Sequence, residues 1–274
     1  MIKGLIFIVI LLLAVNDCKG ENMISNENIL DLKENLDLES LKEVCKKKIY
    51  FGHQSVGFNI IEGIRDIIKD NPSFKLNILE TRYQFDFESP IFAHSTIGHN
   101  QNPYSKCDEF KKIMENGVGN KVEIAFFKFC YVDVDRNTNI LALFDYYAGT
   151  ISQLESEFPQ VKFVYFTVPL TTYNLGINSR IKRLLNIGVP GDLDNIRRNE
   201  FNEMICKKYQ GSHRLFDLAK YESKSLDGKM NNFESGNKNF PTLQIEYAKD
   251  DGHLNCLGRR LVAVKLLDFL TKLK

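Results

Sequence analysis

The chain has 274 residues, 43% of them hydrophobic, with 36 Lys and Arg against 35 Asp and Glu. A net charge of +1 gives no reason to expect nucleic acid or an anionic membrane surface as a partner of the whole chain. Removal of about 20 N-terminal residues leaves roughly 250, which is near the upper limit for one hydrophobic core. We therefore expect one globular enzyme domain over residues 46–274, preceded by a linker or helix over 21–45.

The N-terminus has the pattern of a targeting segment. Lys3 is followed by an apolar stretch from Leu5 to Val15, which is shorter than the ~18–20 residues that span a bilayer. We interpret residues 1–20 as a secretory signal peptide and expect a secreted, periplasmic or cell-envelope protein with no stable membrane span after processing. Lipidation at Cys18 is the alternative, although Asp17 is a poor residue before a lipidated cysteine; an uncleaved membrane anchor is the third reading.

Strand and helix patterns alternate along the rest of the chain. Short apolar runs predict strands at 48–51, 76–79, 122–127, 161–168 and 214–218, and apolar residues at three- and four-residue spacing predict helices at 60–68, 141–158, 201–209 and 257–270. Alternation of this kind indicates a parallel sheet of about five strands covered by helices on both faces, a three-layer α/β/α fold. Two segments have no hydrophobic period. Residues 94–102 predict an exposed polar loop, and residues 223–240 predict a surface loop or a flexible lid.

Cysteine counting leaves the disulfide pattern open. Six cysteines occur, and loss or lipidation of Cys18 leaves five, an odd number in an oxidising compartment. No C-x-x-C spacing supports a zinc or thioredoxin-like site. Cys130 falls in an apolar run, where a buried thiol is the simplest interpretation.

Two short segments almost 200 residues apart carry the chemistry. Ser55 follows the first predicted strand and precedes the first predicted helix, and Asp250 and His253 form an Asp-x-x-His pattern before the last helix. A hydroxyl, an imidazole that takes its proton and a carboxylate that orients the imidazole are the set needed for nucleophilic acyl transfer. Ser55 alone could equally be a helix N-cap. Because ligands bind outside the carboxyl ends of parallel strands, we expect these residues at one shared rim.

These segments resemble the SGNH or GDSL-like hydrolases over about residues 46 to 272. That family places its nucleophilic serine just after the first strand and an Asp-x-x-His motif just before the last helix, although here the usual Gly-Asp-Ser is replaced by Gly52-His53-Gln54-Ser55. The resemblance implies a flavodoxin-like fold, Ser55 as nucleophile, His253 as base and Asp250 as its orienting carboxylate. It also implies an ester substrate, with a carbohydrate O-acetyl ester favoured, and neither a metal nor an organic cofactor.

The resemblance further implies two oxyanion donors. A glycine amide after the second strand corresponds to Gly98, but residues 128–133 hold no counterpart of the family's asparagine. The second donor is then Tyr131, the amide of another loop, or absent. His53, His94 and Asp133 are added as candidate residues lining the site.

Two alternatives remain open at the level of sequence. One is a metal-dependent hydrolase with His94, His99, Asp133 and Asp135 as ligands, although their spacing is unspecific. The other is a catalytically silent glycan-binding or envelope protein that keeps the fold. The expected partner is a small-molecule or glycan ester, and the oligomeric state is not predicted.

Overall fold

The computed structural model describes residues 38–185 and 187–273. The segment interpreted as a signal peptide lies outside these residues. Six parallel strands form one sheet in the order β2-β3-β1-β4-β5-β6, and two antiparallel strands, β7 and β8, form a separate hairpin. The strands are β1 (Lys48–His53), β2 (Ile78–Glu80), β3 (Ile91–Thr96), β4 (Ile124–Phe127), β5 (Lys162–Phe166), β6 (Leu215–Phe216), β7 (Asn232–Ser235) and β8 (Lys238–Pro241).

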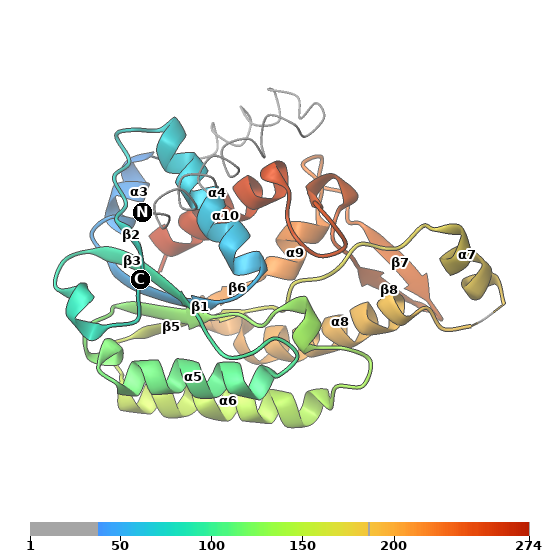
Figure 1. The fold of residues 1–274 in the computed structure, drawn as a ribbon, viewed down its shortest axis with the longest axis horizontal. Helices are drawn as coiled ribbons and strands as arrows, with labels where there is room; N and C mark the ends of the chain where they lie inside the picture. Colours follow the sequence, from blue (N-terminus) through green and yellow to red (C-terminus); the bar gives the residue numbers. More distant parts are fainter. Residues whose placement is uncertain (1–37, 186, 274) are drawn as a thin grey trace, which may run out of the picture.

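Helices cover both faces of the sheet (Figure 1), which confirms the predicted three-layer α/β/α fold. Without the short edge strand β2, the strand order is the 2-1-3-4-5 of flavodoxin-like sheets. The α-helices are α3 (Leu38–Val44), α4 (Val56–Asp70), α5 (Pro103–Glu115), α6 (Ile140–Glu157), α7 (Ile177–Leu184), α8 (Pro190–Tyr209), α9 (Leu218–Ser223) and α10 (Cys256–Thr271).

Alternating side chains of the strands build two cores. Phe51, Phe126 and Phe166 point to the face covered by α4 and α10, whereas Tyr50 and Tyr165 point to the face covered by α5, α6 and α8. Because both faces are covered, the central strands are apolar almost throughout. The five described cysteines form no disulfide, and no helix within 38–185 and 187–273 combines the length and apolar character needed to cross a bilayer.

The prediction of residues 94–102 as one polar loop was wrong for its first part. His94, Ser95 and Thr96 lie in β3, which pairs in parallel with β1. His94 and Ser95 are buried because each has a partner: His94 contacts His53, and Ser95 lies 2.8 Å from the Tyr50 hydroxyl. Only residues 97–102 form the polar loop that joins β3 to α5.

The segment 223–240 is more regular than a loop. Residues 232–241 form the β7–β8 hairpin, whose Phe233 and Phe240 side chains are buried. Residues 225–231 precede the hairpin as a turn, in which the Ser225 amide donates to the Lys229 carbonyl at 2.9 Å. The hairpin therefore belongs to the packed body of the protein.

Helices α4 and α10 pack closely against each other on one face of the sheet (Figure 1). A Cβ placed on Gly63 of α4 would lie 2.2 Å from the Arg259 carbonyl oxygen of α10, so only glycine allows this approach. Arg259 also forms an ion pair with Asp66 at 2.9 Å, and Arg260 one with Asp70 at 2.7 Å. These contacts fix where α10 begins relative to α4.

We predict that Gly63→Ala destabilises the protein by roughly 1–3 kcal/mol, because the methyl group overpacks the helix interface. Gly149→Ala is the matched control: Gly149 is also inside a helix, and its Cβ would meet nothing within 4 Å. The control should gain about 0.5–1 kcal/mol from helix propensity alone. Urea unfolding of both variants measures this difference, and equal effects would show that the α4–α10 contact is not tight.

Candidate active site

Ser55 lies in the turn that joins β1 to α4. Its backbone has φ 52° and ψ −116°, and the Gly57 amide donates to the Gln54 carbonyl at 3.0 Å. This is the first central position of a type II′ turn, which glycine normally fills. A side chain held in such a conformation is strained and is found where the surrounding structure enforces it, often at functional sites.

Gly57 makes this sharp turn possible. A Cβ at Gly57 would lie 2.3 Å from the His53 Cβ, so any larger residue would push α4 away from β1. The hydrogen bond from the Phe58 amide to the Ser55 carbonyl at 2.8 Å starts the helix immediately after the serine. The Ser55 side chain therefore stands at the N-terminus of α4.

The second half of the site is the turn before α10. Ala248 and Leu254 pair as an isolated bridge, and the Asp250 carboxylate accepts from the Gly252 amide at 2.9 Å and the His253 amide at 2.8 Å. Asn255 then caps α10 by accepting from the Gly258 amide at 3.0 Å. Asp250 and His253 are thus held by one rigid local element.

The structure brings the three sequence-predicted residues together. Ser55 Oγ lies 2.7 Å from His253 Nε2, and His253 Nδ1 lies 2.8 Å from Asp250 Oδ2. A carboxylate beside Nδ1 favours the tautomer with the proton on that nitrogen. Nε2 is then the acceptor for the Ser55 hydroxyl, which is the arrangement that activates a serine nucleophile.

Asp250 stays ionised in this arrangement. Partial burial raises the pKa of its carboxyl, but hydrogen bonds from the Gly252 and His253 amides and from the His253 ring outweigh burial, so that the pKa of Asp250 lies below its ordinary value. A charged carboxylate is what holds the imidazole in the required orientation.

Groups from other elements support the turn that carries Asp250 and His253. The Asn59 side chain of α4 accepts from the Leu254 amide at 3.2 Å, and the Thr172 amide, in the loop after β5, donates to the Asp251 carbonyl at 2.8 Å. Tyr131 packs edge-on against the His253 ring, with centroids 5.6 Å apart. A Cβ at Gly252 would lie 2.5 Å from the Tyr131 ring. Tyr131 therefore packs against the His253 ring and the Gly252 backbone, a position that the sequence did not suggest.

The Gly98 amide does not face an open site. It donates to Glu109 Oε2 at 2.6 Å, which corrects the expectation that it is an oxyanion donor. The Ser55 and Val56 amides, by contrast, have no acceptor among the described residues. Both lie at the N-terminus of α4, where the helix dipole also favours negative charge.

Asp133 is buried and does not line a cleft, which corrects a second expectation. Its carboxylate forms an ion pair with Lys106 of α5, which is also fully buried, and accepts from the Gln101 and Cys130 amides at 2.9 and 2.6 Å. Lys106 also donates to Asn100 Oδ1 at 3.0 Å. No pattern in the sequence pointed to Lys106. The pair joins the loop after β3 to the segment after β4, so that both strand ends are held in place.

His53 and His94 form a buried pair below the turn. The sequence predicted that they line the site, but neither side chain reaches solvent. His53 Nε2 lies 3.1 Å from His94 Nδ1, and the His53 ring packs against Phe51 and Phe58. Burial lowers the pKa of His94 to about 4 and that of His53 well below its ordinary value, with the neighbouring histidine as the next cause for His53. Both rings are therefore neutral at pH 7, and burial keeps them from lining an open cleft, which corrects the expectation for His53 and His94.

The proposed metal set is not assembled. His94 is engaged with His53, Asp133 is engaged with Lys106, and no group of three or more metal-ligating side chains occurs in the described part of the chain.

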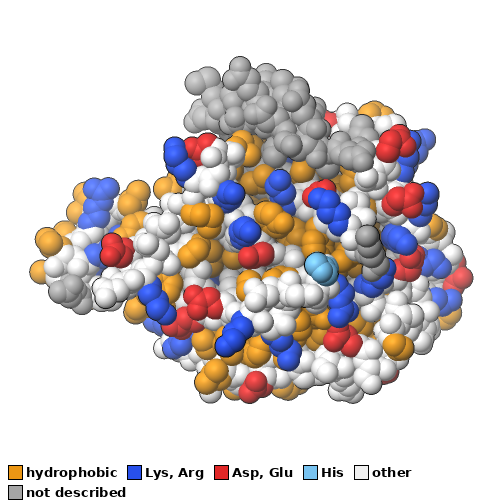
Figure 2. All heavy atoms as spheres, turned by 180° about the vertical axis from the view of Figure 1, so that it is seen from behind, with side chains coloured by type: hydrophobic (Ala, Val, Ile, Leu, Met, Phe, Trp, Pro, Cys, Tyr) orange, Lys and Arg blue, Asp and Glu red, His pale blue; other side chains and the backbone are white. Residues whose placement is uncertain are grey.

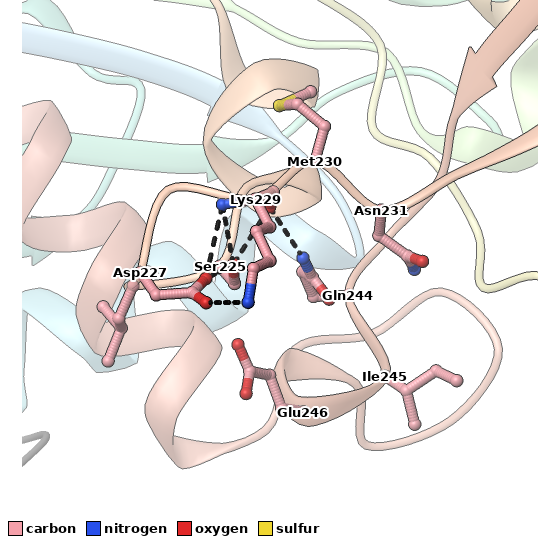
Figure 3. Close-up of a pocket in the computed structure, with 9 residues that line it drawn as sticks. Ser225, Asp227, Lys229, Met230, Asn231, Gln244, Ile245 and Glu246 are labelled. Carbon is pink, nitrogen blue, oxygen red and sulfur yellow. Dashed lines mark hydrogen bonds and ion pairs between the residues drawn. The ribbon is translucent and has the colours of Figure 1, made fainter.

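A pocket of about 750 Å³ lies between the turn 225–231 and residues 244–246 (Figure 3). Figure 3 shows the Lys229 ammonium paired with the Asp227 carboxylate, at 2.8 Å, and Gln244 directed at the Lys229 backbone. The residues drawn there contain no histidine beside the Ser225 hydroxyl, so this pocket lacks the base that the Ser55 site has.

No family model and no curated protein matches the chain. Among solved structures it is similar to a candidate platelet activating factor from Streptococcus pneumonia, at 13% identity, TM-score 0.48, covering 90% of this chain and 100% of that chain. It is also similar to a candidate G-D-S-L family lipolytic protein from Desulfitobacterium hafniense, at 8% identity, TM-score 0.47, covering 81% and 99%. A third similarity is to the periplasmic domain of a lipopolysaccharide acetyltransferase from Salmonella ser. Paratyphi A, at 12% identity, TM-score 0.42, covering 93% and 100%. TM-scores below 0.5 at such low identity carry no functional information. The chemistry of the site is therefore inferred from its own geometry.

The buried histidine pair predicts a pH-dependent stability. The unfolded chain binds a proton at His94 near pH 6.5, but the folded protein does so only near pH 4. The free energy of unfolding should therefore be constant above that interval and fall as the pH drops through it, by about 1.4 kcal/mol per pH unit for each such histidine. Urea unfolding between pH 7 and pH 4 measures the slope.

His94→Asn should flatten this slope, whatever its effect on stability at pH 7. His99→Asn is the control, because His99 is exposed in the loop that follows β3. An unchanged slope in His94→Asn would contradict a neutral, buried His94.

Proposed function

We propose that this protein is a serine-dependent hydrolase of carboxylic esters, with Ser55 as nucleophile. The observation that supports this most directly is the continuous contact from Ser55 Oγ through the His253 ring to the Asp250 carboxylate, with links of 2.7 and 2.8 Å. A serine that serves only as a helix cap needs no such base, and Ser55 makes no side-chain capping bond to α4.

The geometry suits a two-step acyl transfer. Ser55 Oγ forms a bond to the ester carbonyl carbon while its proton moves to His253 Nε2. Collapse of the tetrahedral intermediate breaks the bond to the alcohol oxygen, which takes that proton and leaves. Water then attacks the acyl-serine, again losing a proton to His253, and releases the carboxylic acid and the free Ser55 hydroxyl. Asp250 holds the ring and stabilises the imidazolium that forms in each step.

The Ser55 and Val56 amides are our candidates for the oxyanion donors. Both lie at the N-terminus of α4, next to the nucleophile, and have no acceptor among the residues that the structure describes. A backbone amide that is already positioned needs no reorganisation as negative charge develops on the carbonyl oxygen.

We propose an O-acetylated carbohydrate as the substrate. The His253 side chain is 35% exposed and that of Asp250 is 54% exposed, so the catalytic pair lies at the surface of the molecule. An open site of this kind admits a bulky alcohol such as a glycan, and a small acyl group needs no deep pocket. Export to the cell envelope, as the N-terminal pattern of Lys3 and an apolar run suggests, would give access to such substrates.

We predict that a fluorophosphonate probe labels Ser55, because the probe reacts only with an activated serine. Ser55→Ala and His253→Ala should each abolish labelling, whereas Ser225→Ala, which removes an exposed hydroxyl outside the site, should label normally. Peptide mapping identifies the labelled residue. A folded wild-type protein that remains unlabelled would instead favour the catalytically silent, glycan-binding alternative.

A second prediction separates two neighbouring carboxylates. Asp250→Asn keeps an oxygen for the Gly252 and His253 amides but no longer fixes the ring tautomer, so kcat for an acetyl ester should fall by roughly 10²–10⁴-fold. Asp251→Asn is the matched control and should stay within about twofold, because it is the Asp251 backbone carbonyl that the Thr172 amide binds. Similar losses in both variants would argue against a specific role for Asp250.

A further inference from the structure

Helix α7 projects from the body of the protein beyond β7 and β8 (Figure 1) and has no buried residue. It nevertheless carries an apolar stripe, since Ile177, Ile181, Leu184 and Leu185 recur at the spacing of one helix face. Ile177 is 76% exposed and Leu184 is 83% exposed. Three more exposed apolar side chains lie close to α7 in sequence: Leu175, Ile187 and Leu193. Clustered exposure of this kind marks an interaction surface.

Helix α7 itself carries only positive charges, those of Arg180, Lys182 and Arg183. The next acidic residues along the chain, Asp192 and Asp194 of α8, are both engaged in ion pairs with arginine side chains. Arg180 and Lys182 flank the stripe on its two sides, are exposed, and have no carboxylate partner among the described residues. Figure 2 shows this projection from behind, with hydrophobic and Lys or Arg side chains side by side at its end and an Asp or Glu side chain beside them.

The third cation explains why the stripe points outward. The Arg183 guanidinium donates to both oxygens of Asp192 of α8, at 2.7 and 2.8 Å, and lies 3.7 Å above the Tyr173 ring. Tyr173 in turn stacks on Phe233 of the β7–β8 hairpin, with centroids 5.1 Å apart. Because Arg183 lies on the helix face opposite the stripe, this anchor fixes α7 with its apolar side chains away from the body.

We infer that α7 docks the protein on an anionic lipid surface. The apolar stripe would enter the boundary between headgroups and acyl chains, and Arg180 and Lys182 would meet the lipid phosphates. A second copy of the chain fits less well, because a two-fold contact between stripes would bring the Arg180 and Lys182 side chains of the two copies together, while Asp192 and Asp194 are already paired with other arginines. The near-neutral charge of the whole chain does not reveal this feature, since the positive charge is local.

The position of α7 connects docking to the catalytic rim. The loop from β5 to α7 passes the catalytic turn, where the Thr172 amide donates to the Asp251 carbonyl at 2.8 Å. Five residues later, Ile177 begins the helix. A protein held by α7 would therefore keep Ser55 and His253 near the lipid surface.

Vesicle co-sedimentation tests the inference with the full chain. Wild type should bind vesicles in which about one third of the phosphatidylcholine is replaced by phosphatidylglycerol, and high salt should weaken binding. Ile177→Ser combined with Leu184→Ser should lower the affinity at least about tenfold, and Arg180→Gln combined with Lys182→Gln by about tenfold. All four side chains are exposed, so folding should be unaffected; circular dichroism checks this.

Leu226→Ser combined with Met230→Ser is the matched control, because it removes two exposed apolar side chains at the pocket of Figure 3 and should leave binding unchanged. Ser55→Ala should also bind normally, which separates docking from catalysis. Equal binding of the wild type and the Ile177/Leu184 variant to vesicles would overturn the inference. So would a wild-type protein that does not bind anionic vesicles, or one that self-associates through α7 in their absence.

Discussion

The backbone contact between α4 and α10 is the constraint on which the candidate site depends. Ser55 and His253 are 198 residues apart in sequence, and each lies just before the first turn of one of these helices. Gly63 lets the helices touch, and the Arg259–Asp66 and Arg260–Asp70 ion pairs set how far one is displaced along the other. A shift of one helix by a fraction of a turn would separate hydroxyl from imidazole, so the 2.7 Å contact is determined by packing two turns away.

Polar groups below the rim form a second, structural layer. The buried Lys106–Asp133 pair joins helix α5 to the segment after β4, and the neutral His53–His94 pair joins two neighbouring strands. Buried charges and imidazoles are costly unless they are paired, so each pair specifies one arrangement of the strand ends that carry the site. The candidate catalytic residues at the surface thus rest on polar contacts that substrate does not reach.

The sequence was informative where a residue's environment is local. Ser55 after an apolar strand and the Asp250-x-x-His253 spacing identified the residues that the structure places in contact. Strand β3 and helix α5 were missed because His94, Ser95 and Lys106 are polar yet buried, and their partners lie 27 to 45 residues away. Helix α7 shows the opposite case. Its apolar periodicity normally indicates a buried face, but here that face is exposed.

The conformation of Ser55 sets backbone stability against the presence of a hydroxyl group at one position. With φ at 52°, the residue occupies backbone space in which glycine is unstrained and serine is not. Selection for folding alone would favour glycine at position 55, which would relieve the strain and delete the hydroxyl in the same step. A serine at this position keeps the hydroxyl despite the backbone strain, which is the compromise that the proposed nucleophile would require.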